Sequence, residues 1–237
     1  MNGNEDRPDL AQDIDALYVR IEAEIAAGID RIPVGVEPAD APRVSLPAGG
    51  KKERLSALEK QAEACRACPL HEQRNRLVFG AGDPESRLMF VGEAPGPEED
   101  REGLPFVGRA GQLLTKMIEA MGYTRDTVYI ANLIKCHPAG DRTPSPAEIA
   151  ACRGFLESQI MTLSPTVIVA LGAPAAKTLL DRDEDITSLR GRLFPYGGDH
   201  SITIIPTFHP TYLLHNESEK GKVWQDLQKA MALLQKA

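Results

Sequence analysis

The four cysteines of the chain fall into two groups whose spacing is typical of a metal or iron-sulfur site. Two residues separate Cys65 from Cys68, and fifteen separate Cys136 from Cys152. The short spacer lets the first two sulfurs reach one metal or cluster, and the second pair would complete a four-thiolate site once the chain folds. Two disulfides or isolated buried thiols are the alternatives. The acidic start of the chain lacks the pattern of a secretory signal, which argues against disulfides.

A segment rich in glycine, proline and acidic residues, 92–111, has the composition of a ligand-binding loop. Its glycines permit close approach of the backbone to a ligand, and a helix that begins near Arg109 would offer free N–H groups. Phe106 is either part of the core or a platform on which a planar ring such as a nucleobase stacks. The carboxylates of Glu93, Glu99 and Asp100 are either solvated loop charges or groups of a binding site.

Asn132 and His209 each follow a short apolar run and are two further candidates for site residues. An asparagine amide both donates and accepts, so it matches a carbonyl group beside an N–H on the edge of a base. A histidine in the sequence Phe208-His209-Pro210 could donate a hydrogen bond to an oxygen that gains negative charge in a reaction. A turn or cap for Asn132 and a structural role for His209 are the alternatives.

Short branched runs alternate with helical patterns from about Lys51 onward, which predicts an α/β fold with a parallel sheet between helices. Strands are expected at 88–91, 128–133, 167–171 and 202–205, and helices at 109–121, from Ser145, at 172–180 and at 223–235. Ser145 and Glu148 have the spacing of a capping box. Ligands of such sheets bind beyond the carboxyl ends of the strands. The candidate residues come at or after the ends of expected strands, so they would lie at this edge of the sheet.

Residues 1–50 form an N-terminal extension that differs from the domain expected at 51–237. Leucine and isoleucine recur at helical spacing over residues 8–27, and four prolines then mark a stiff linker. The extension carries ten acidic side chains and four arginines, so it holds six of the seven net negative charges of the chain. The helix packs either on its own domain or on a partner protein. A nearly neutral main body leaves room for a basic DNA-binding patch.

Several other classes of protein fit the sequence poorly. No apolar run approaches the length of a membrane span, so a cytoplasmic protein without a membrane partner is expected. The chain has neither a G-x-x-x-x-G-K-[ST] phosphate loop nor a G-x-S-x-G nucleophile motif. His71 and His137 lie near the cysteines and would suit a zinc site, but four sulfurs already complete one.

Taken together, these motifs resemble family 4 of the uracil-DNA glycosylase superfamily, its iron-sulfur branch. The resemblance spans about residues 58–234 and includes the four cysteines, residues 92–96 and 103–111, Asn132 with Lys135, and residues 209–214. It implies a 4Fe-4S cluster held by Cys65, Cys68, Cys136 and Cys152. It also implies a three-layer sandwich with a four-stranded parallel sheet between helices, and hydrolytic removal of uracil from DNA.

The resemblance further assigns roles to single residues. The flipped uracil ring would lie on Phe106 and hydrogen-bond the amide of Asn132, while Glu99 crowds the side of the ring where thymine has its methyl group. His209 would hydrogen-bond the uracil oxygen beside the glycosidic nitrogen. Glu93 would hold the water or the sugar. Ala94 stands where better-known branches have a water-activating Asp, and Leu213 or Leu214 would fill the gap in the base stack.

The expected partner is uracil-containing DNA, single- or double-stranded, and the expected oligomeric state is a monomer. The enzyme would be nucleoid-associated while it acts on DNA, and the N-terminal extension is a candidate contact for a repair or replication partner. Two other functions remain open at this point. A noncatalytic nucleic-acid-binding module of the replication machinery would use the cluster only for folding, and a redox sensor would change its oxidation state.

Overall fold

The computed structural model of the protein describes Val44, residues 48–197 and residues 199–236. All of them belong to one compact unit, Pro38–Ala237. The helix expected over residues 8–27 and the four prolines of the linker lie outside the described residues. None of the helices in the described part of the chain combines the length and the apolar character needed to span a lipid bilayer.

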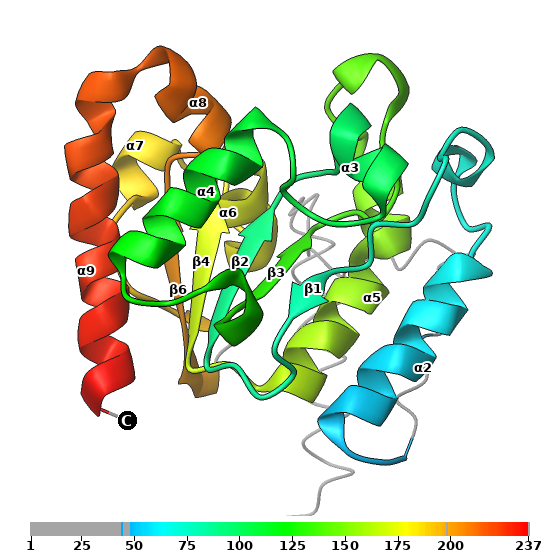
Figure 1. The fold of residues 1–237 in the computed structure, drawn as a ribbon, viewed down its shortest axis with the longest axis horizontal. Coiled ribbons are helices and arrows are strands. Elements are labelled where there is room, and N and C mark those ends of the chain that lie inside the picture. Colours follow the sequence, from blue (N-terminus) through cyan, green and yellow to red (C-terminus); the bar gives the residue numbers. More distant parts are fainter. Residues whose placement is uncertain (1–43, 45–47, 198, 237) are drawn as a thin grey trace, which may run out of the picture. The chain divides into compact units, whose positions relative to one another are not determined.

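A mixed sheet of six strands, in the order β1-β3-β2-β4-β6-β5, forms the centre of this unit (Figure 1). The four inner strands are parallel to one another, which confirms the predicted sheet. One short antiparallel strand lies at each edge of the sheet, β1 at one edge and β5 at the other. Both are too short for hydrophobic periodicity to predict them. The bounds are β1 Ala81–Gly82, β2 Leu88–Gly92, β3 Tyr129–Asn132, β4 Val167–Leu171, β5 Phe194–Tyr196 and β6 Asp199–Thr207.

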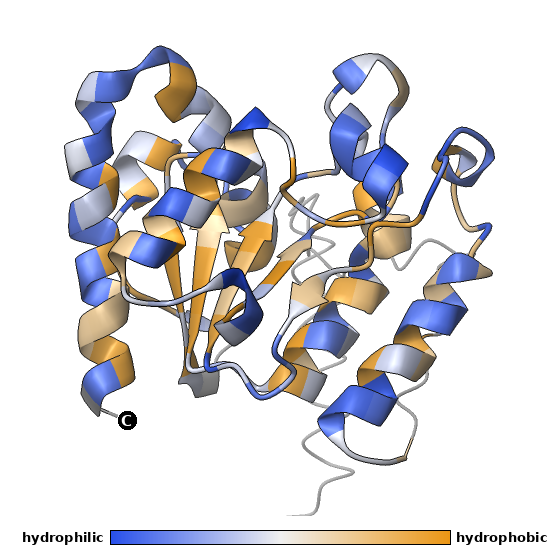
Figure 2. Ribbon diagram, viewed as in Figure 1, coloured by the Kyte–Doolittle hydropathy of each residue, from blue (hydrophilic) through white to orange (hydrophobic). Residues whose placement is uncertain are grey.

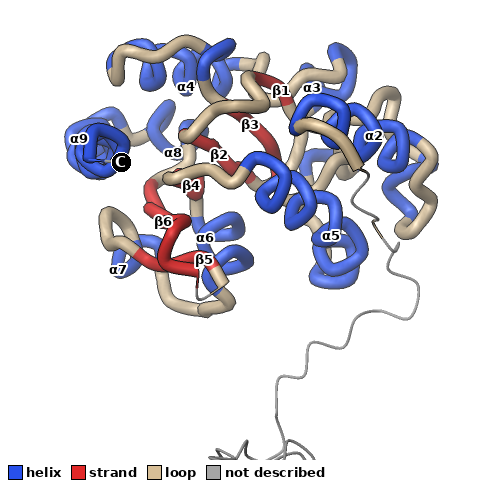
Figure 3. Tube along the Cα trace, turned by 90° about the horizontal axis from the view of Figure 1, so that it is seen from below, coloured by secondary structure: helices blue, strands red, loops and turns tan. Residues whose placement is uncertain are grey.

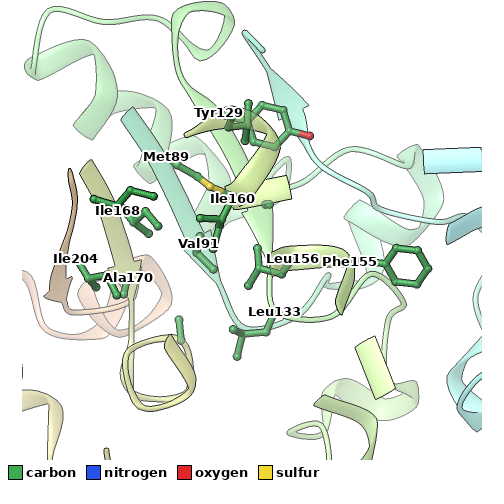
Figure 4. Close-up of a cluster of buried hydrophobic side chains, with 14 of the residues drawn as sticks. Met89, Val91, Tyr129, Leu133, Phe155, Leu156, Ile160, Ile168, Ala170 and Ile204 are labelled. Carbon is green, nitrogen blue, oxygen red and sulfur yellow. The ribbon is translucent and has the colours of Figure 1, made fainter. Parts of the chain in front are cut away.

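The inner strands are buried on both faces because consecutive residues point to opposite sides of a sheet. In β2, Met89 and Val91 belong to one apolar cluster, whereas Leu88 and Phe90 belong to the other. All four side chains are at most 1% exposed. Figure 4 shows part of the first cluster, and in Figure 2 the strands are mostly hydrophobic while the helices carry hydrophilic residues as well. Continuous apolar runs therefore suit these strands.

Helices cover each face of the sheet (Figure 3). The first cluster includes residues of α2 Lys51–Glu63, α5 Pro146–Leu163, α6 Ala173–Leu180 and α7 Ile186–Leu189. The second includes residues of α4 Arg109–Ala120, α8 Pro210–His215 and α9 Lys220–Lys236. The remaining helical segments are α3 Pro97–Glu102 and the four 3-10 turns η1 Pro69–Glu72, η2 Arg125–Thr127, η3 Ala139–Asp141 and η4 Glu217–Glu219.

The predicted start of α5 is confirmed in detail. The Ser145 hydroxyl accepts from the backbone N–H of Glu148 at 3.3 Å, and the Glu148 carboxylate accepts from the backbone N–H of Ser145 at 2.7 Å. This reciprocal pair satisfies two N–H groups that a helix start leaves free. By contrast, α3 and α8 occupy segments expected to be loops.

Candidate active site

A cleft of about 570 Å³ opens where the loops after β2, β3 and β6 meet. Its lining includes Glu93, Glu99, Phe106, Asn132 and His209, five residues that the sequence assigned to one site. Both α3 and α8 lie near the end of the sheet to which β2 points (Figure 1). The parallel topology therefore brings together side chains that are far apart in the sequence.

Phe106 is held in a backbone conformation that residues with side chains rarely adopt. Its φ is 55°, in the left-handed region, and its side chain is only 6% exposed. The guanidinium of Arg125 donates to the carbonyl oxygens of Phe106 at 3.0 Å and of Pro105 at 2.6 Å. A Cβ on Gly111 would lie 1.8 Å from the Phe106 carbonyl oxygen, so only glycine allows this contact. Together these contacts fix the backbone from which the Phe106 ring extends, and Phe106 lines the cleft.

Glu99 ties the two parts of the glycine-rich loop together. Its carboxylate accepts from the backbone N–H groups of Gly96 at 3.0 Å, Val107 at 2.8 Å and Gly108 at 2.9 Å. The side chain is buried, so these bonds replace the water that an ionised carboxylate needs. Glu99 is therefore not a solvated loop charge. The neighbouring Asp100 accepts from the backbone and side chain of Asn75, which makes it a structural group outside the cleft.

Asn132 presents an unused hydrogen-bond acceptor. The residue ends β3 directly beside Gly92 of β2 and is 1% exposed. Its side-chain oxygen Oδ1 is buried and has no hydrogen-bond partner among the residues that the structure describes. Burying such an oxygen without a partner costs about 1–3 kcal/mol, so an orphaned acceptor indicates a missing ligand. A Cβ on Gly92 would lie 2.4 Å from Phe106 Cζ and 2.5 Å from this oxygen. Ring and amide therefore border the same small space.

His209 is fixed as a neutral donor. The residue caps α8, and its Nδ1 accepts from the backbone N–H of Thr211 at 3.2 Å. An N–H can only donate, so Nδ1 carries no proton and the neutral ring has its proton on Nε2. Burial lowers the pKa of His209 to about 4, although the nearby Glu99 opposes this shift. The imidazole ring lies 5.7 Å from the Phe106 ring, measured between centroids.

Glu93 and Ala94 follow β2 and line the cleft. Burial raises the pKa of Glu93, since the charged form loses contact with water. Arg109 and Arg142 also line the cleft, and sequence reasoning missed both. Arg142 donates two bonds to the Glu148 carboxylate, at 2.8 and 2.6 Å. Its position could have been suspected only from the predicted start of α5 a few residues later.

The two leucines expected to enter the base stack are not equally placed. Leu213 is 1% exposed and packs in the second apolar cluster. To enter DNA it would have to leave the core, at a cost of about 1.5–3 kcal/mol. Leu214 is partly buried. The sequence could not show which of the two leucines is buried, because the orientation of α8 about its axis depends on its packing against other helices.

All four cysteines line a second cavity, and none of them forms a disulfide. Cys65 follows α2, Cys68 caps η1, Cys136 follows β3 and Cys152 lies in α5. The other lining side chains are mostly apolar. Among the residues that the structure describes, no three His, Cys, Asp or Glu side chains form a group that could hold one metal ion. The four sulfurs therefore border a shared space rather than a single point.

The surroundings of this cavity suit a negatively charged thiolate group. The guanidinium of Arg74 donates to Cys136 Sγ at 3.1 Å, and the buried Lys135 favours the thiolate form of Cys152. Burial nevertheless dominates and raises the pKa of Cys68, Cys136 and Cys152, the last to about 12. Without iron these thiols would stay protonated, and a bound cluster would displace the protons. His71 and His137 instead bond to backbone carbonyl oxygens.

Comparison with known proteins agrees with this geometry. Residues 79–228 match the family model of the uracil DNA glycosylase superfamily. The type-4 uracil-DNA glycosylase of Thermotoga maritima is 44% identical over 189 residues, which are 78% of this chain and 97% of that protein. That of Sulfurisphaera tokodaii is 38% identical over 76% of this chain and 85% of the relative. The type-5 uracil-DNA glycosylase of Thermus thermophilus is 33% identical, but the match covers only 44% of this chain and 54% of that protein. The chain belongs to the type-4 branch of the uracil-DNA glycosylase superfamily.

Proposed function

We propose that this protein removes uracil from DNA by hydrolysis of the N-glycosidic bond and leaves an abasic site, the first step of base excision repair. The observation that carries this proposal is the buried Asn132 Oδ1, which has no hydrogen-bond partner in the described part of the chain and borders the same small space as the edge of the Phe106 ring. A planar base with an N–H next to a carbonyl would complete this site. The curated relatives are named uracil-DNA glycosylases, which supports an enzyme rather than a noncatalytic module.

Uracil fits these groups better than the other pyrimidines do. Its ring N–H would donate to Asn132 Oδ1, and the amide NH2 would donate to the adjacent carbonyl oxygen. Cytosine presents the opposite pattern at this edge and would leave buried groups unpaired, at about 1–3 kcal/mol each. The fixed carboxylate of Glu99 supports the expectation that its side of the pocket has no room for the methyl group of thymine.

The leaving uracil takes the electron pair of the bond between its N1 and C1′ of the sugar. Negative charge then develops on the uracil oxygen next to N1, where the Nε2–H of His209 would donate. A neutral donor suits this role because it needs no proton transfer. Water supplies the new oxygen on C1′. Its proton would pass to Glu93, whose raised pKa favours proton uptake, and then to solvent.

We further propose that Cys65, Cys68, Cys136 and Cys152 hold a 4Fe-4S cluster. In such a cluster each cysteine binds a different iron, which suits sulfurs arranged around a cavity. The cluster would supply structural support near Asn132 rather than take part in bond cleavage.

We assign the activity to residues 51–237. We also propose that the protein acts as a monomer. A DNA substrate implies work at the nucleoid, and residues 1–50 are the proposed contact with a repair or replication partner.

The test is to incubate the purified protein with single- and double-stranded oligonucleotides that contain one uracil, and to cleave abasic sites with alkali. We expect cleavage at uracil and none in matched oligonucleotides with thymine or cytosine. Asn132→Leu should keep the fold but lose uracil release. If protein with an intact cluster leaves every uracil oligonucleotide uncut, the proposal is wrong.

A further inference from the structure

The exposed member of the segment after His209 is an aromatic residue and not a leucine. Tyr212 is 43% exposed, whereas Leu213 is 1% exposed. The large apolar side chains that are exposed among the described residues also include Leu104, Met161 and Leu193. Tyr212 stands apart from Met161 and Leu193 because it lies one residue after Thr211, which lines the cleft, and three after His209. Leu104 lies two residues before Phe106, which also lines the cleft, but its side chain is aliphatic and cannot stack as a flat ring does. The Tyr212 ring is thus at the surface beside the site.

The backbone of Tyr212 is held firmly although its ring is exposed. Its N–H donates to the carbonyl oxygen of His209 at 3.0 Å. Its own carbonyl oxygen accepts from the backbone N–H and from the side-chain amide of Asn216, both at 3.0 Å. The exposed ring therefore has a fixed origin on α8, and little ordering remains to be done when a ligand binds.

A series of stacked and bonded groups supports the ring from the protein interior. The Tyr212 ring lies 4.9 Å from the ring of the buried Phe208, at 39° between planes. The guanidinium carbon of Arg190 lies 5.6 Å from the Phe208 centroid on the ring face. Arg190 in turn donates at 2.7 Å to Asp226, which is 1% exposed. Asp226 also accepts from the Thr207 hydroxyl at 2.7 Å.

This support has no evident part in holding the uracil ring, since none of Arg190, Phe208 or Asp226 lines the cleft. These contacts instead hold the exposed Tyr212 ring in position beside the site. A base that leaves a duplex creates a gap between flat neighbours, and a flat ring fills such a gap while it stacks on the next base. Tyrosine has the shape and the surface for this contact.

We propose that the ring of Tyr212 stacks on the base next to the extruded deoxyuridine and occupies the space that the deoxyuridine leaves. This inference rests on the proposed function. Loss of one stacking contact between an aromatic side chain and a base lowers affinity by about 5- to 150-fold. The effect should be larger for a duplex than for a single strand, because only the duplex holds a closed stack on both sides of the gap.

The experiment compares Tyr212→Ala, Tyr212→Phe and the control Met161→Ala, whose residue is 60% exposed on α5. Binding is measured to a duplex with a stable tetrahydrofuran abasic site and 2-aminopurine as the neighbouring base. We expect Tyr212→Ala to bind about 5- to 150-fold more weakly and to leave the 2-aminopurine signal less quenched. Tyr212→Phe and Met161→Ala should match wild type.

Unchanged binding and quenching by Tyr212→Ala would overturn the inference, as would Leu104→Ala causing the loss instead. Thermal unfolding of each variant checks that the fold is intact, and substitution of an exposed ring should leave it so. The tetrahydrofuran duplex has no base to release at that position. Failure of the wild-type protein to release uracil would therefore refute the proposed function by a separate measurement.

Discussion

A single methyl group added at Gly92 should disrupt the uracil pocket without unfolding the protein. Gly92 ends β2 beside Asn132, and its φ is not in the left-handed region that only glycine adopts easily. The backbone therefore tolerates alanine. The conflict is steric: the new Cβ would lie 2.4 Å from Phe106 Cζ and 2.5 Å from Asn132 Oδ1.

The size of the effect follows from these distances. Ordinary contact with a Cβ begins at 3.4 Å, so the ring edge and the amide oxygen must each move by about 1 Å. Misplacement of binding groups by 1 Å can lower the rate by about 100-fold. Overpacking of this kind costs about 1–3 kcal/mol of folding free energy, which most domains survive. Gly92→Ala should therefore remain folded and lose about two orders of magnitude in kcat/KM for uracil excision.

Single-turnover release of uracil from an oligonucleotide measures the loss, and thermal unfolding with the visible spectrum of the cluster checks the fold. Gly221→Ala is the matched control, since a Cβ at Gly221 in α9 meets nothing within 4 Å. If Gly92→Ala released uracil as fast as Gly221→Ala, Phe106 and Asn132 could not be the groups that grip the base.

Four further substitutions, at three positions, test other parts of the protein. His209→Ala should lower kcat by about 100- to 1000-fold, because one donor to a developing negative charge is lost, while the affinity for abasic DNA stays the same. Burial lowers the pKa of His209 to about 4, so the unfolded chain binds a proton at a higher pH than the folded protein does. Between about pH 6.5 and 4, wild type should therefore lose about 3 kcal/mol of unfolding free energy relative to His209→Asn. Urea unfolding curves that change equally with pH in both proteins would contradict this. Arg125→Met removes the donor to the carbonyl oxygens of Pro105 and Phe106, so the strained backbone at Phe106 should relax and displace the ring; steady-state kinetics should show KM raised by about 5- to 150-fold, with a smaller change in kcat. Cys136→Ala should lower the melting temperature and DNA affinity together, whereas a loss of activity alone would argue against a supporting role for the cluster.

The sequence predicted the parts of this protein that local patterns determine. The apolar runs located the inner strands because each is buried on both faces, and Ser145 with Glu148 located the start of α5. The cysteine spacing predicted that the four thiols share one site, and they line one cavity; the order of Asn132 and His209 along the chain predicted one site at the strand ends, and both line one cleft. In each case the pattern lies within a few residues or follows from parallel topology.

Contacts between distant segments could not be predicted in the same way. Glu99 reads as one of several loop acids, and its bonds to Val107 and Gly108 depend on how the loop turns back. Arg125 reaches carbonyl oxygens about twenty residues earlier, which no periodicity marks. Whether Tyr212 or Leu213 faces solvent depends on the packing of α8 against α4. Such features become visible only in the folded chain.

Lys135 gives the cysteine cavity a direct route to Asn132. Its backbone N–H bonds to the thiol of Cys152, and its side-chain Nζ donates to the Asn132 carbonyl oxygen at 2.8 Å and to Gln159 at 2.6 Å. The ammonium is fully buried, so it depends on nearby negative charge and on these acceptors. Iron-bound thiolates at Cys136 and Cys152 would supply that charge. Without these thiolates the buried ammonium of Lys135 is less stable. A movement that exposes the ammonium to water would break its hydrogen bond to the Asn132 carbonyl oxygen. Loss of the proposed cluster should therefore displace the Asn132 amide while His209 keeps its hydrogen bond to Thr211.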